Sequence, residues 1–563
     1  MNQPTSVIAA PVCAGPEIDA PEQARMVAAL AQWLGAPRGG VAARAVEVVQ
    51  THISFVLLAG GSAYKIRKAL DLGFLDFRSL ASRRFDCDEE LRLNRRLAPA
   101  LYLGVLPVTG PVAAPALDGD GAVLDWAVQM RAFPQDVQWD RAIVRGALEP
   151  RHIDELADLL WPFHRDAPVW VAAAAREPTP GFGLPAAVRA PVLECLMTLD
   201  VAVGDAVQNA TARAALVELA AWEARAFGAL RGAFARRLRD GHIREVHGDL
   251  HLGNVTQLDG RCTVFDCIEF NPALRWIDVA SDIAFMSMDL HAHGRADLAN
   301  RFVNAWLERS GDHAGVRVLR YHLVYRALVR AKVAALRAAQ IDATGASPAP
   351  VEHTVALAAR DRYLGVAQAF TRPPWPTLML THGFSGSGKT SATQSLIERC
   401  GAIRVRADVE RKRLFGVAPN ARSDAALKAA LYADAATEAT HARLRQAARV
   451  ALRSGFSVIL DATFLRHAPR AQARALATEL GARFVIIDFL ADAQTLRERV
   501  CERAARGDDA SEADLAVLEA QFIAAEPLRV EEQADVFPCD TSTWPDPGVP
   551  GHAWDGLLAR LGA

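Results

Sequence analysis

The segment 377–390, TLMLTHGFSGSGKT, constrains the fold of this chain more than any other stretch. An apolar run ends there at a loop with the spacing G-x-x-x-x-G-K-[ST], in which Gly383, Gly388, Lys389 and Thr390 hold the fixed positions. Glycines let consecutive backbone N–H groups turn inward on phosphate oxygens, and the positive end of the following helix adds to the attraction. In such a loop the lysine reaches the β and γ phosphates and the threonine ligates Mg²⁺. The expected phosphate-binding set is Gly383, Phe384, Ser385, Gly386, Ser387, Gly388, Lys389, Thr390 and Ser391.

Two more short apolar runs, FSVILDAT and ARFVIIDFL, follow this loop and are separated from it and from each other by helical patterns. That alternation is typical of an α/β domain in which helices cover a parallel sheet. The stretches DATGASPAP at 342–350 and TRPPWP at 371–376 are the best linker signals. We therefore expect a linker at 341–375 and a three-layer α/β P-loop domain with a parallel sheet at 376–563.

Five further residues of this second half are candidates for chemistry. Asp461 ends the run SVIL, where a strand-end carboxylate would complete a magnesium shell, although a helix N-cap is the alternative. In ADVERKR, Asp408 is a candidate acceptor of a substrate hydroxyl proton and Arg411 a candidate substrate ligand; a solvated basic helix start is the alternative. Arg499 and Arg503 lie four apart on one helical face and could serve as lid cations, or be ordinary surface arginines.

In the first half, VHGDLHLGNV at 246–255 admits three interpretations: a zinc site, a helix start, or the catalytic loop H-x-D-x-x-x-x-N of a phosphotransferase. A zinc site needs two more ligands at useful spacing, and Gly253 works against a helix start. The third interpretation makes Asp249 a catalytic base and Asn254 a magnesium ligand.

The residues that follow favour the third interpretation. NVTQLDGRCTVFD predicts a hairpin with a two-residue turn at Asp259 and Gly260. Counting back from that turn places Asn254 opposite Phe265, so that Asp266 is the next residue along. Asn254 and Asp266 are thereby predicted to be two metal ligands at one open end of the hairpin.

An earlier hairpin is predicted within 46–68, with Gly60 and Gly61 as its turn. Lys65 on its second strand has the A-x-K spacing of a kinase strand lysine, which binds nucleotide phosphate, and Lys68 has the opposite parity. We prefer Lys65. Its acidic partner should come from the helix expected at about 78–97, where Glu90 is preferred over Glu89, although a solvated helix charge remains an alternative.

Bulk properties narrow the class of protein. At 563 residues the chain predicts two or three domains, and a net charge of −2 gives no reason to expect nucleic acid or an anionic membrane as a partner. The eight cysteines contain no C-x-x-C pair, which favours a reducing, cytoplasmic location. Neither a signal peptide nor a membrane span is expected. We expect an N-terminal extension at 1–40 and an α+β domain at 41–340, and the oligomeric state stays open.

The second half resembles P-loop small-substrate kinases of the zeta-toxin, polynucleotide-kinase and gluconate-kinase type, through GFSGSGKT, ADVERKR, VILDATF and RERVCER. This resemblance implies that Asp408 is the base and that Arg499 and Arg503 belong to a lid.

Residues 40–340 resemble the aminoglycoside phosphotransferase and choline-kinase branch of the protein-kinase-like fold, through HGDLHLGN, FDCIEF and RWIDVASDIAF. This resemblance implies a two-lobed domain, ATP and Mg²⁺ as cofactors, and Asp266 as the metal-binding aspartate. The stretch AGGSA stands where a G-x-G-x-x-G loop would be expected.

The order of the two halves resembles that of bacterial bifunctional aminoglycoside phosphotransferase/ATP-binding proteins. We therefore expect an ATP-dependent kinase with two nucleotide sites, each passing the γ-phosphate to a hydroxyl of a small molecule. A nucleotide-gated regulatory ATPase is one alternative, and a nucleic-acid 5′-hydroxyl kinase in the second half is another.

Overall fold

The structure is a computed structural model. It describes residues 18–37, 45–51, 53–71, 76–171, 181–204, 209–343, 351–506, 509–542 and 552–561. The chain divides into two compact units, one formed by Met1–Leu148 with His247–Trp276 and the other by Glu149–Val246 with Ile277–Ala563. Among the described residues, no helix has both the length and the apolar character that crossing a bilayer requires.

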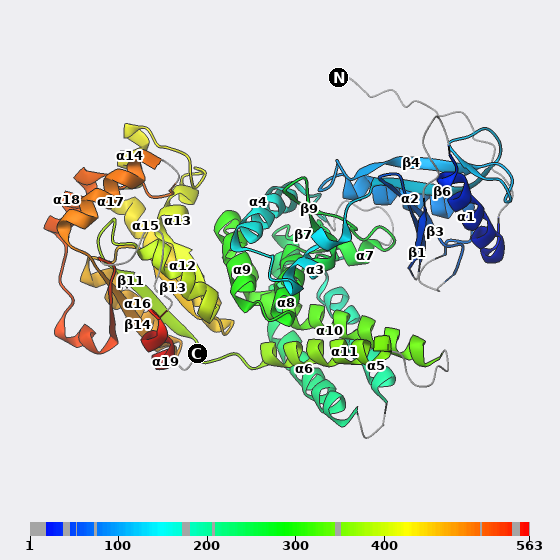
Figure 1. The fold of residues 1–563 in the computed structure, drawn as a ribbon. Coiled ribbons are helices and arrows are strands. Elements are labelled where there is room, and N and C mark those ends of the chain that lie inside the picture. The colour runs from blue at the N-terminus through cyan, green and yellow to red at the C-terminus, as the bar shows by residue number, and fades with distance from the viewer. Residues whose placement is uncertain are drawn as a thin grey trace. The chain divides into compact units, whose positions relative to one another are not determined.

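The first unit is built on a six-stranded antiparallel sheet with the order β1-β2-β3-β6-β4-β5 (Figure 1). Its strands are β1 (Glu47–Gln50), β2 (Ser54–Ala59), β3 (Ser62–Arg67), β4 (Tyr102–Thr109), β5 (Ala116–Leu117) and β6 (Val123–Arg131). The register Ala59↔Ser62 places Gly60 and Gly61 in the turn, both with positive φ, so the predicted hairpin is confirmed.

Two helices pack on this sheet. Helix α1 (Ala20–Gly35) buries Met26 and Leu30 in one core with Phe55 and Ile66 of the sheet. Helix α2 (Leu80–Asn94) contributes Leu80 and Cys87 to a second core, with Tyr102 and Trp126. Helix α1 lies inside 1–40, the range assigned above to an N-terminal extension, and its apolar face makes it part of the packed unit; residues 1–17 and 38–44 lie outside the described residues.

The segment 247–276 completes the first unit. A 3₁₀ turn, η4 (Leu252–Asn254), leads into the antiparallel hairpin β8 (Val255–Leu258) and β9 (Arg261–Val264). Leu258 pairs with Arg261, and the Phe265 N–H donates to the Asn254 carbonyl at 3.0 Å, so the predicted register is confirmed. Asp259 and Gly260 form the turn with positive φ. The short elements η1 (Gln135–Val137), α3 (Trp139–Val144) and α7 (Pro272–Arg275) belong to the same unit.

The second unit begins with a helical part. It contains α4 (Pro150–Asp166), α5 (Pro185–Val203), α6 (Ala210–Arg239), β7 (Ile243–Glu245), β10 (Trp276–Asp278), α8 (Val279–Ala292), α9 (Ala296–Ser310), η5 (His313–Gly315), α10 (Val316–Asp342) and α11 (Val351–Thr371). Helix α11 lies inside the range 341–375 that was expected to be a linker. It packs along α10, and its Tyr363 hydroxyl donates to Asp289 on α8 at 2.7 Å, because its apolar face is buried there. Residues 344–350 of that range lie outside the described residues.

The remainder of the second unit is an α/β layer structure whose sheet has the order β12-β13-β11-β14-β15. All four strand pairs are parallel, as the apolar runs predicted. Its strands are β11 (Thr377–His382), β12 (Ile403–Arg406), β13 (Val458–Asp461), β14 (Arg483–Leu490) and β15 (Val536–Asp540). The helical elements are α12 (Lys389–Cys400), α13 (Ala407–Leu414), α14 (Ala425–Leu431), α15 (Asp434–Arg453), α16 (His467–Glu479), α17 (Ala493–Arg506), α18 (Leu515–Ala524), η6 (Val530–Asp535) and α19 (Asp555–Leu561) (Figure 1).

Candidate active sites

In the first unit, a lysine joins two carboxylates that come from separate elements. Lys65 on β3 donates from Nζ to Glu90 Oε1 on α2 and to Asp266 Oδ1 after β9, each at 2.8 Å. Lys68 instead donates to the Thr51 carbonyl at 2.7 Å and lies over the Phe55 ring. Of the two lysines left open by the sequence, the structure thus brings Lys65 to the acidic residues.

The charges of this cluster support one another. Burial alone would lower the pKa of Lys65, but Asp266 and Glu90 outweigh it and raise that pKa above its ordinary value. Burial would raise the pKa of Asp266, but the Lys65 ammonium outweighs it and holds the pKa below its usual range. Both groups are therefore charged at neutral pH. Glu89, the other acidic candidate on α2, pairs with Arg92 and Arg275.

Asp249 and Asn254 lie together at the start of the hairpin. The Asn254 side-chain amide donates to the Asp249 carbonyl at 2.9 Å and to Asp249 Oδ2 at 3.1 Å. His251 Nε2 is 3.3 Å from Asp249 Oδ2. Gly248 precedes the aspartate with φ +85°, and a Cβ there would be 2.6 Å from the Leu274 carbonyl oxygen. Only glycine fits this position, which accounts for the Gly in HGDLHLGN.

A buried arginine that none of the sequence motifs marks also belongs to this cluster. Arg67, 1% exposed, contacts Asp86, Glu90 and Glu269. It lies two residues after Lys65 on the same face of β3, a parity signal that could have identified it. Lys65 and Arg67 therefore face four carboxylates, those of Asp86, Glu90, Asp266 and Glu269. Burial and the neighbouring Glu90 raise the pKa of Glu269 to about 8, although Arg67 acts against them.

The oxygen atoms of this site suit a hard divalent cation. Asn254 uses its NH₂ group toward Asp249, which leaves its carbonyl oxygen as an acceptor, and Asp266 offers a carboxylate whose side chain is 45% exposed. Magnesium is bound by one or two carboxylates together with substrate phosphates, so this donor set fits Mg²⁺. In the part of the chain that the structure describes, no group of three or more His, Cys, Asp and Glu residues is arranged to hold a metal ion.

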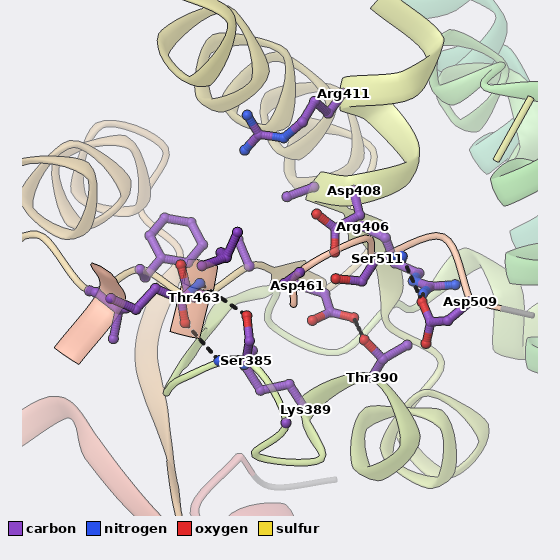
Figure 2. Close-up of a pocket in the computed structure, with 18 of the residues that line it drawn as sticks. Ser385, Lys389, Thr390, Arg406, Asp408, Arg411, Asp461, Thr463, Asp509 and Ser511 are labelled. Atoms are coloured by element: carbon purple, nitrogen blue, oxygen red, sulfur yellow. Dashed lines mark hydrogen bonds and ion pairs between the residues drawn. The ribbon is translucent and has the colours of Figure 1, made fainter. Parts of the chain in front are cut away.

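In the second unit, a cavity of about 1470 Å³ opens over the glycine loop (Figure 2). The loop lies between β11 and α12, as its spacing predicted. Gly383 has φ +141°, and a Cβ there would be 2.7 Å from the Phe489 carbonyl oxygen; Gly388 has φ +77° and immediately precedes α12. Both positions therefore require glycine, and they aim the start of α12 at the cavity.

Lys389 lies against its own loop. Its Nζ donates to the carbonyls of Gly383 at 2.9 Å and Phe384 at 2.6 Å, and to Ser387 Oγ at 3.2 Å. Burial lowers the pKa of Lys389 to about 8, while the carboxylates of Asp461 and Asp408 act in the opposite direction. The Lys389 ammonium is thus enclosed by its own loop, and burial there favours the neutral amine.

Thr390, in the first turn of α12, is hydrogen-bonded to Asp461, the last residue of β13. Thr390 Oγ1 donates to Asp461 Oδ2 at 2.8 Å, and both side chains line the cavity. A hydroxyl and a carboxylate so placed are oxygen ligands of the kind that Mg²⁺ prefers, so the pair fits the ion. The helix N-cap, the alternative for Asp461, is not observed, because α16 begins at His467.

The other predicted side chains of this half also line the cavity. Asp408 on α13 faces it beside Arg411, whose Nη1 donates to the Leu431 carbonyl and Thr437 Oγ1 and whose guanidinium lies over the Tyr432 ring. Arg499 donates to Thr541, and Arg503 donates to the Ala513 carbonyl. Figure 2 shows Asp408, Asp461 and Thr390 on the same side of the cavity.

The predicted loop set divides between the cavity wall and the core. Ser385, Gly386, Gly388, Lys389, Thr390 and Ser391 line the cavity. The Phe384 ring packs edge-on against Phe522 at 4.8 Å, and Ser387 is 1% exposed. Neither of these two residues lines the cavity.

Three lining residues were missed by the sequence analysis. The Gln521 side chain accepts from the Ser385 N–H at 2.9 Å and donates to Ser385 Oγ at 3.0 Å. Arg406 donates to Asp509 at 3.2 Å, and Arg301 reaches the cavity from α9. Gln521 and Arg301 are distant in sequence from every motif, so no local spacing marks them. Arg406 stands two residues before Asp408 and had a positional signal.

Comparisons with known proteins cover both halves. Residues 378–528 match the model of a family described as an AAA domain. Uncharacterised proteins of Mycobacterium tuberculosis and Mycobacterium bovis are each 29% identical over 486 residues, which cover 84% of this chain and 90% of theirs.

Two solved structures are similar to parts of the chain. A choline/ethanolamine kinase family protein from Mesorhizobium loti is 13% identical, with a TM-score of 0.33, and the match covers 62% of this chain and 99% of that one. A gluconokinase from Sinorhizobium meliloti 1021 is 19% identical, with a TM-score of 0.24, and the match covers 34% of this chain and 93% of that one.

Proposed function

We propose that this chain is an ATP-dependent phosphotransferase with two nucleotide sites, each transferring the γ-phosphate to a hydroxyl of a small molecule. The observation that carries the proposal is a lysine close to oxygen ligands suited to Mg²⁺ in each unit: Lys65 is hydrogen-bonded to Asp266, and Lys389 is followed by Thr390, which is hydrogen-bonded to Asp461. Phosphoryl transfer needs positioning and charge neutralisation more than covalent chemistry, and these are the groups that supply both.

At the first site, Lys65 binds nucleotide phosphate and Glu90 fixes the direction of its ammonium. Asn254 and Asp266 would hold Mg²⁺, which would supply positive charge beside the nucleotide phosphates. Asp249 accepts the proton of the acceptor hydroxyl, and its hydrogen bond with Asn254 keeps the base beside the metal ligand. Residues 41–340 form a protein-kinase-like domain in this proposal.

At the second site, the loop N–H groups and Lys389 hold the triphosphate, while Thr390 and Asp461 hold Mg²⁺. Asp408 is the proton acceptor, and Arg411, which also lines the cavity, holds the acceptor molecule. Arg499 and Arg503 stabilise the charge of the transferring phosphoryl group. The cavity of about 1470 Å³ is large enough for a nucleotide and a second small molecule together.

The test uses the full chain and four proteins: wild type, Asp249→Asn, Lys389→Ala and the double variant. ATP consumption is measured against sugars, aminoglycosides, amino alcohols and 5′-hydroxyl oligonucleotides. We expect acceptor-dependent turnover that falls by about 10²-fold or more when the responsible site is altered, because each change removes a base or a phosphate ligand. Nucleotide titration should show two binding events per chain.

Each contrary outcome identifies an alternative. ATP hydrolysis without any acceptor, lost only in Lys389→Ala, would identify a regulatory ATPase. Phosphate transfer only to oligonucleotide ends would identify a nucleic-acid kinase. A single binding event per chain, unchanged in Asp266→Asn, would overturn the proposal for the first site.

A further inference from the structure

Helix α9 closes one side of the P-loop sheet within the second unit. The Asn304 side chain donates to the Ala402 carbonyl at 3.0 Å and accepts from the Arg404 N–H at 2.7 Å, and thereby pairs with the edge strand β12. Arg301 binds Glu398 on α12 at 2.7 Å, and Asn300 donates to the Glu398 carbonyl. A helix that precedes the P-loop sequence by about seventy residues is therefore in contact with the loop's own helix.

The last turn of α9 reaches the cavity wall through Glu308, whose carboxylate also lies 3.7 Å from Arg404 Nη2. Glu308 accepts from Arg406 Nη1 at 2.7 Å, and Arg406 Nη2 donates to Asp509 at 3.2 Å. Arg406 lies at the end of β12, two residues before Asp408, and it lines the cavity with a side chain that is 15% exposed. Figure 2 shows its guanidinium beside Asp509.

The charges at this wall give Arg406 a task. Asp408, Asp461 and Asp509 are three of the carboxylates that line the cavity, and without a cation beside it each would repel a triphosphate. Arg406 is a cation set among them, and the negative charges of Glu308, Asp461 and Asp509 raise its pKa against the effect of burial. An arginine side chain has many rotamers, so the position of the Arg406 guanidinium depends on the carboxylates that accept its hydrogen bonds.

We propose that Glu308 is a positioning residue of the P-loop site, which holds Arg406 where its charge offsets the neighbouring carboxylates and so favours nucleotide binding. This inference rests on the proposed function of the second site. It makes helix α9, which precedes the P-loop domain in sequence, a working part of that domain's nucleotide site. Glu308 acts through Arg406 and does not itself touch the ligand.

The sign of one measurement separates positioning from simple electrostatics. Removing a carboxylate near a phosphate site strengthens anion binding if charge alone matters. If Glu308 positions Arg406, its removal weakens binding instead. We expect Glu308→Ala to bind magnesium AMP-PNP about fivefold more weakly than the wild type, in the binding component that Lys389→Ala abolishes. The affinity of Glu308→Gln should lie between those of the wild type and Glu308→Ala, because its amide oxygen still accepts from Arg406.

The experiment is titration calorimetry on the full-length variants Glu308→Ala, Glu308→Gln, Arg406→Ala and the double variant Glu308→Ala/Arg406→Ala. Because Glu308 acts through Arg406, the double variant should match Arg406→Ala alone. The matched control is Asp158→Ala. This change removes an exposed carboxylate on α4 that pairs with Arg309, the residue after Glu308 on α9, and it should leave the affinity for nucleotide unchanged. Melting temperatures verify that each variant is folded.

The outcomes are distinguishable. Unchanged or tighter binding in Glu308→Ala, additive losses in the double variant, or an equal loss in Asp158→Ala would each overturn the inference while the proposed function stands. Absence of any Lys389-dependent binding in the wild type would overturn the proposed function of this site and the inference with it. Binding without turnover would still support the positioning role, since the measurement needs no acceptor.

Discussion

Lys65 and Asp266 are 201 positions apart in the chain, and a hydrogen bond of 2.8 Å joins Lys65 Nζ to Asp266 Oδ1. The register of two antiparallel hairpins produces this contact. One presents Lys65 from β3 in the middle of the sheet, and the other ends at Asp266, which has φ +61°. A non-glycine residue in this conformation is uncommon and is found where the surrounding structure requires a particular side-chain direction.

Lys65→Met is expected to lower turnover at the first site by about 10²-fold or more, because it removes the ammonium that contacts both Glu90 and Asp266. Lys68→Met is the matched control, since Lys68 lies three residues after Lys65 and its ammonium contacts the Thr51 carbonyl and the Phe55 ring. Steady-state kinetics of both variants on the first-site acceptor check this. Equal losses in both would mean that Lys65 has no special role.

Arg67→Met is expected to destabilise the protein by about 3–5 kcal/mol, because it leaves buried carboxylates without their cation. Arg78→Met is the control. Arg78 also pairs with acidic residues, but its side chain is 65% exposed, and exposed ion pairs contribute about 0–1 kcal/mol. Urea unfolding followed by circular dichroism measures both, and a similar small effect for the two variants would contradict the predicted role of the buried network.

The raised pKa of Glu269 predicts a pH dependence of stability. Its folded pKa is about 8 against an ordinary value of 4.5, so the folded protein binds the proton more tightly than the unfolded chain does. The resulting stabilisation is complete below about pH 4.5 and is lost as pH rises through about 8. Unfolding measured between pH 5 and 9 should show this decline, and Glu269→Gln should flatten it. A slope that is the same in the variant would assign the decline to other groups.

The lowered pKa of Lys389 predicts proton uptake on nucleotide binding. At pH 8.5 about three quarters of the free protein has a neutral Lys389, given its pKa of about 8, and a bound triphosphate restores the charge. Affinity at this site should therefore be constant below about pH 7 and fall as pH rises past 8. Calorimetry in buffers of different ionisation enthalpy counts the protons taken up.

Lys389→Arg is the control for that measurement, because a guanidinium stays protonated throughout this range. Its binding should take up no proton at pH 8.5. Equal uptake by both proteins would place the proton on another group.

The sequence predicted best those features that local spacing determines. The glycine loop, the hairpin register around Asp259 and the parity of Lys65 depend on residues within a few positions of each other, and the strand, turn and pairing observed agree with them. Helix α11 and helix α1 were placed in ranges expected to be a linker and an extension. Their roles depend on which distant surface their apolar faces meet, and local pattern carries no such information.

The composition of each site shows the same limit. Arg67 and Arg406 sit two residues from Lys65 and Asp408, so spacing could have found them. Glu308 and Gln521 could not be found in this way, because they reach their partners from 98 and 136 residues away. Spacing identifies the chemical groups that share a loop, whereas folding decides which remote side chains hold them.

The hydrogen bonds of Asn304 also bear on the tendency of this protein to aggregate. A sheet's outermost strand presents unpaired peptide groups that can recruit a strand from another molecule and start aggregation. The Asn304 amide occupies the carbonyl of Ala402 and the N–H of Arg404 on the outer strand β12. A shortened protein that began at residue 376 would expose the edge strand β12 and should self-associate. Helix α9 therefore also protects the P-loop sheet from aggregation.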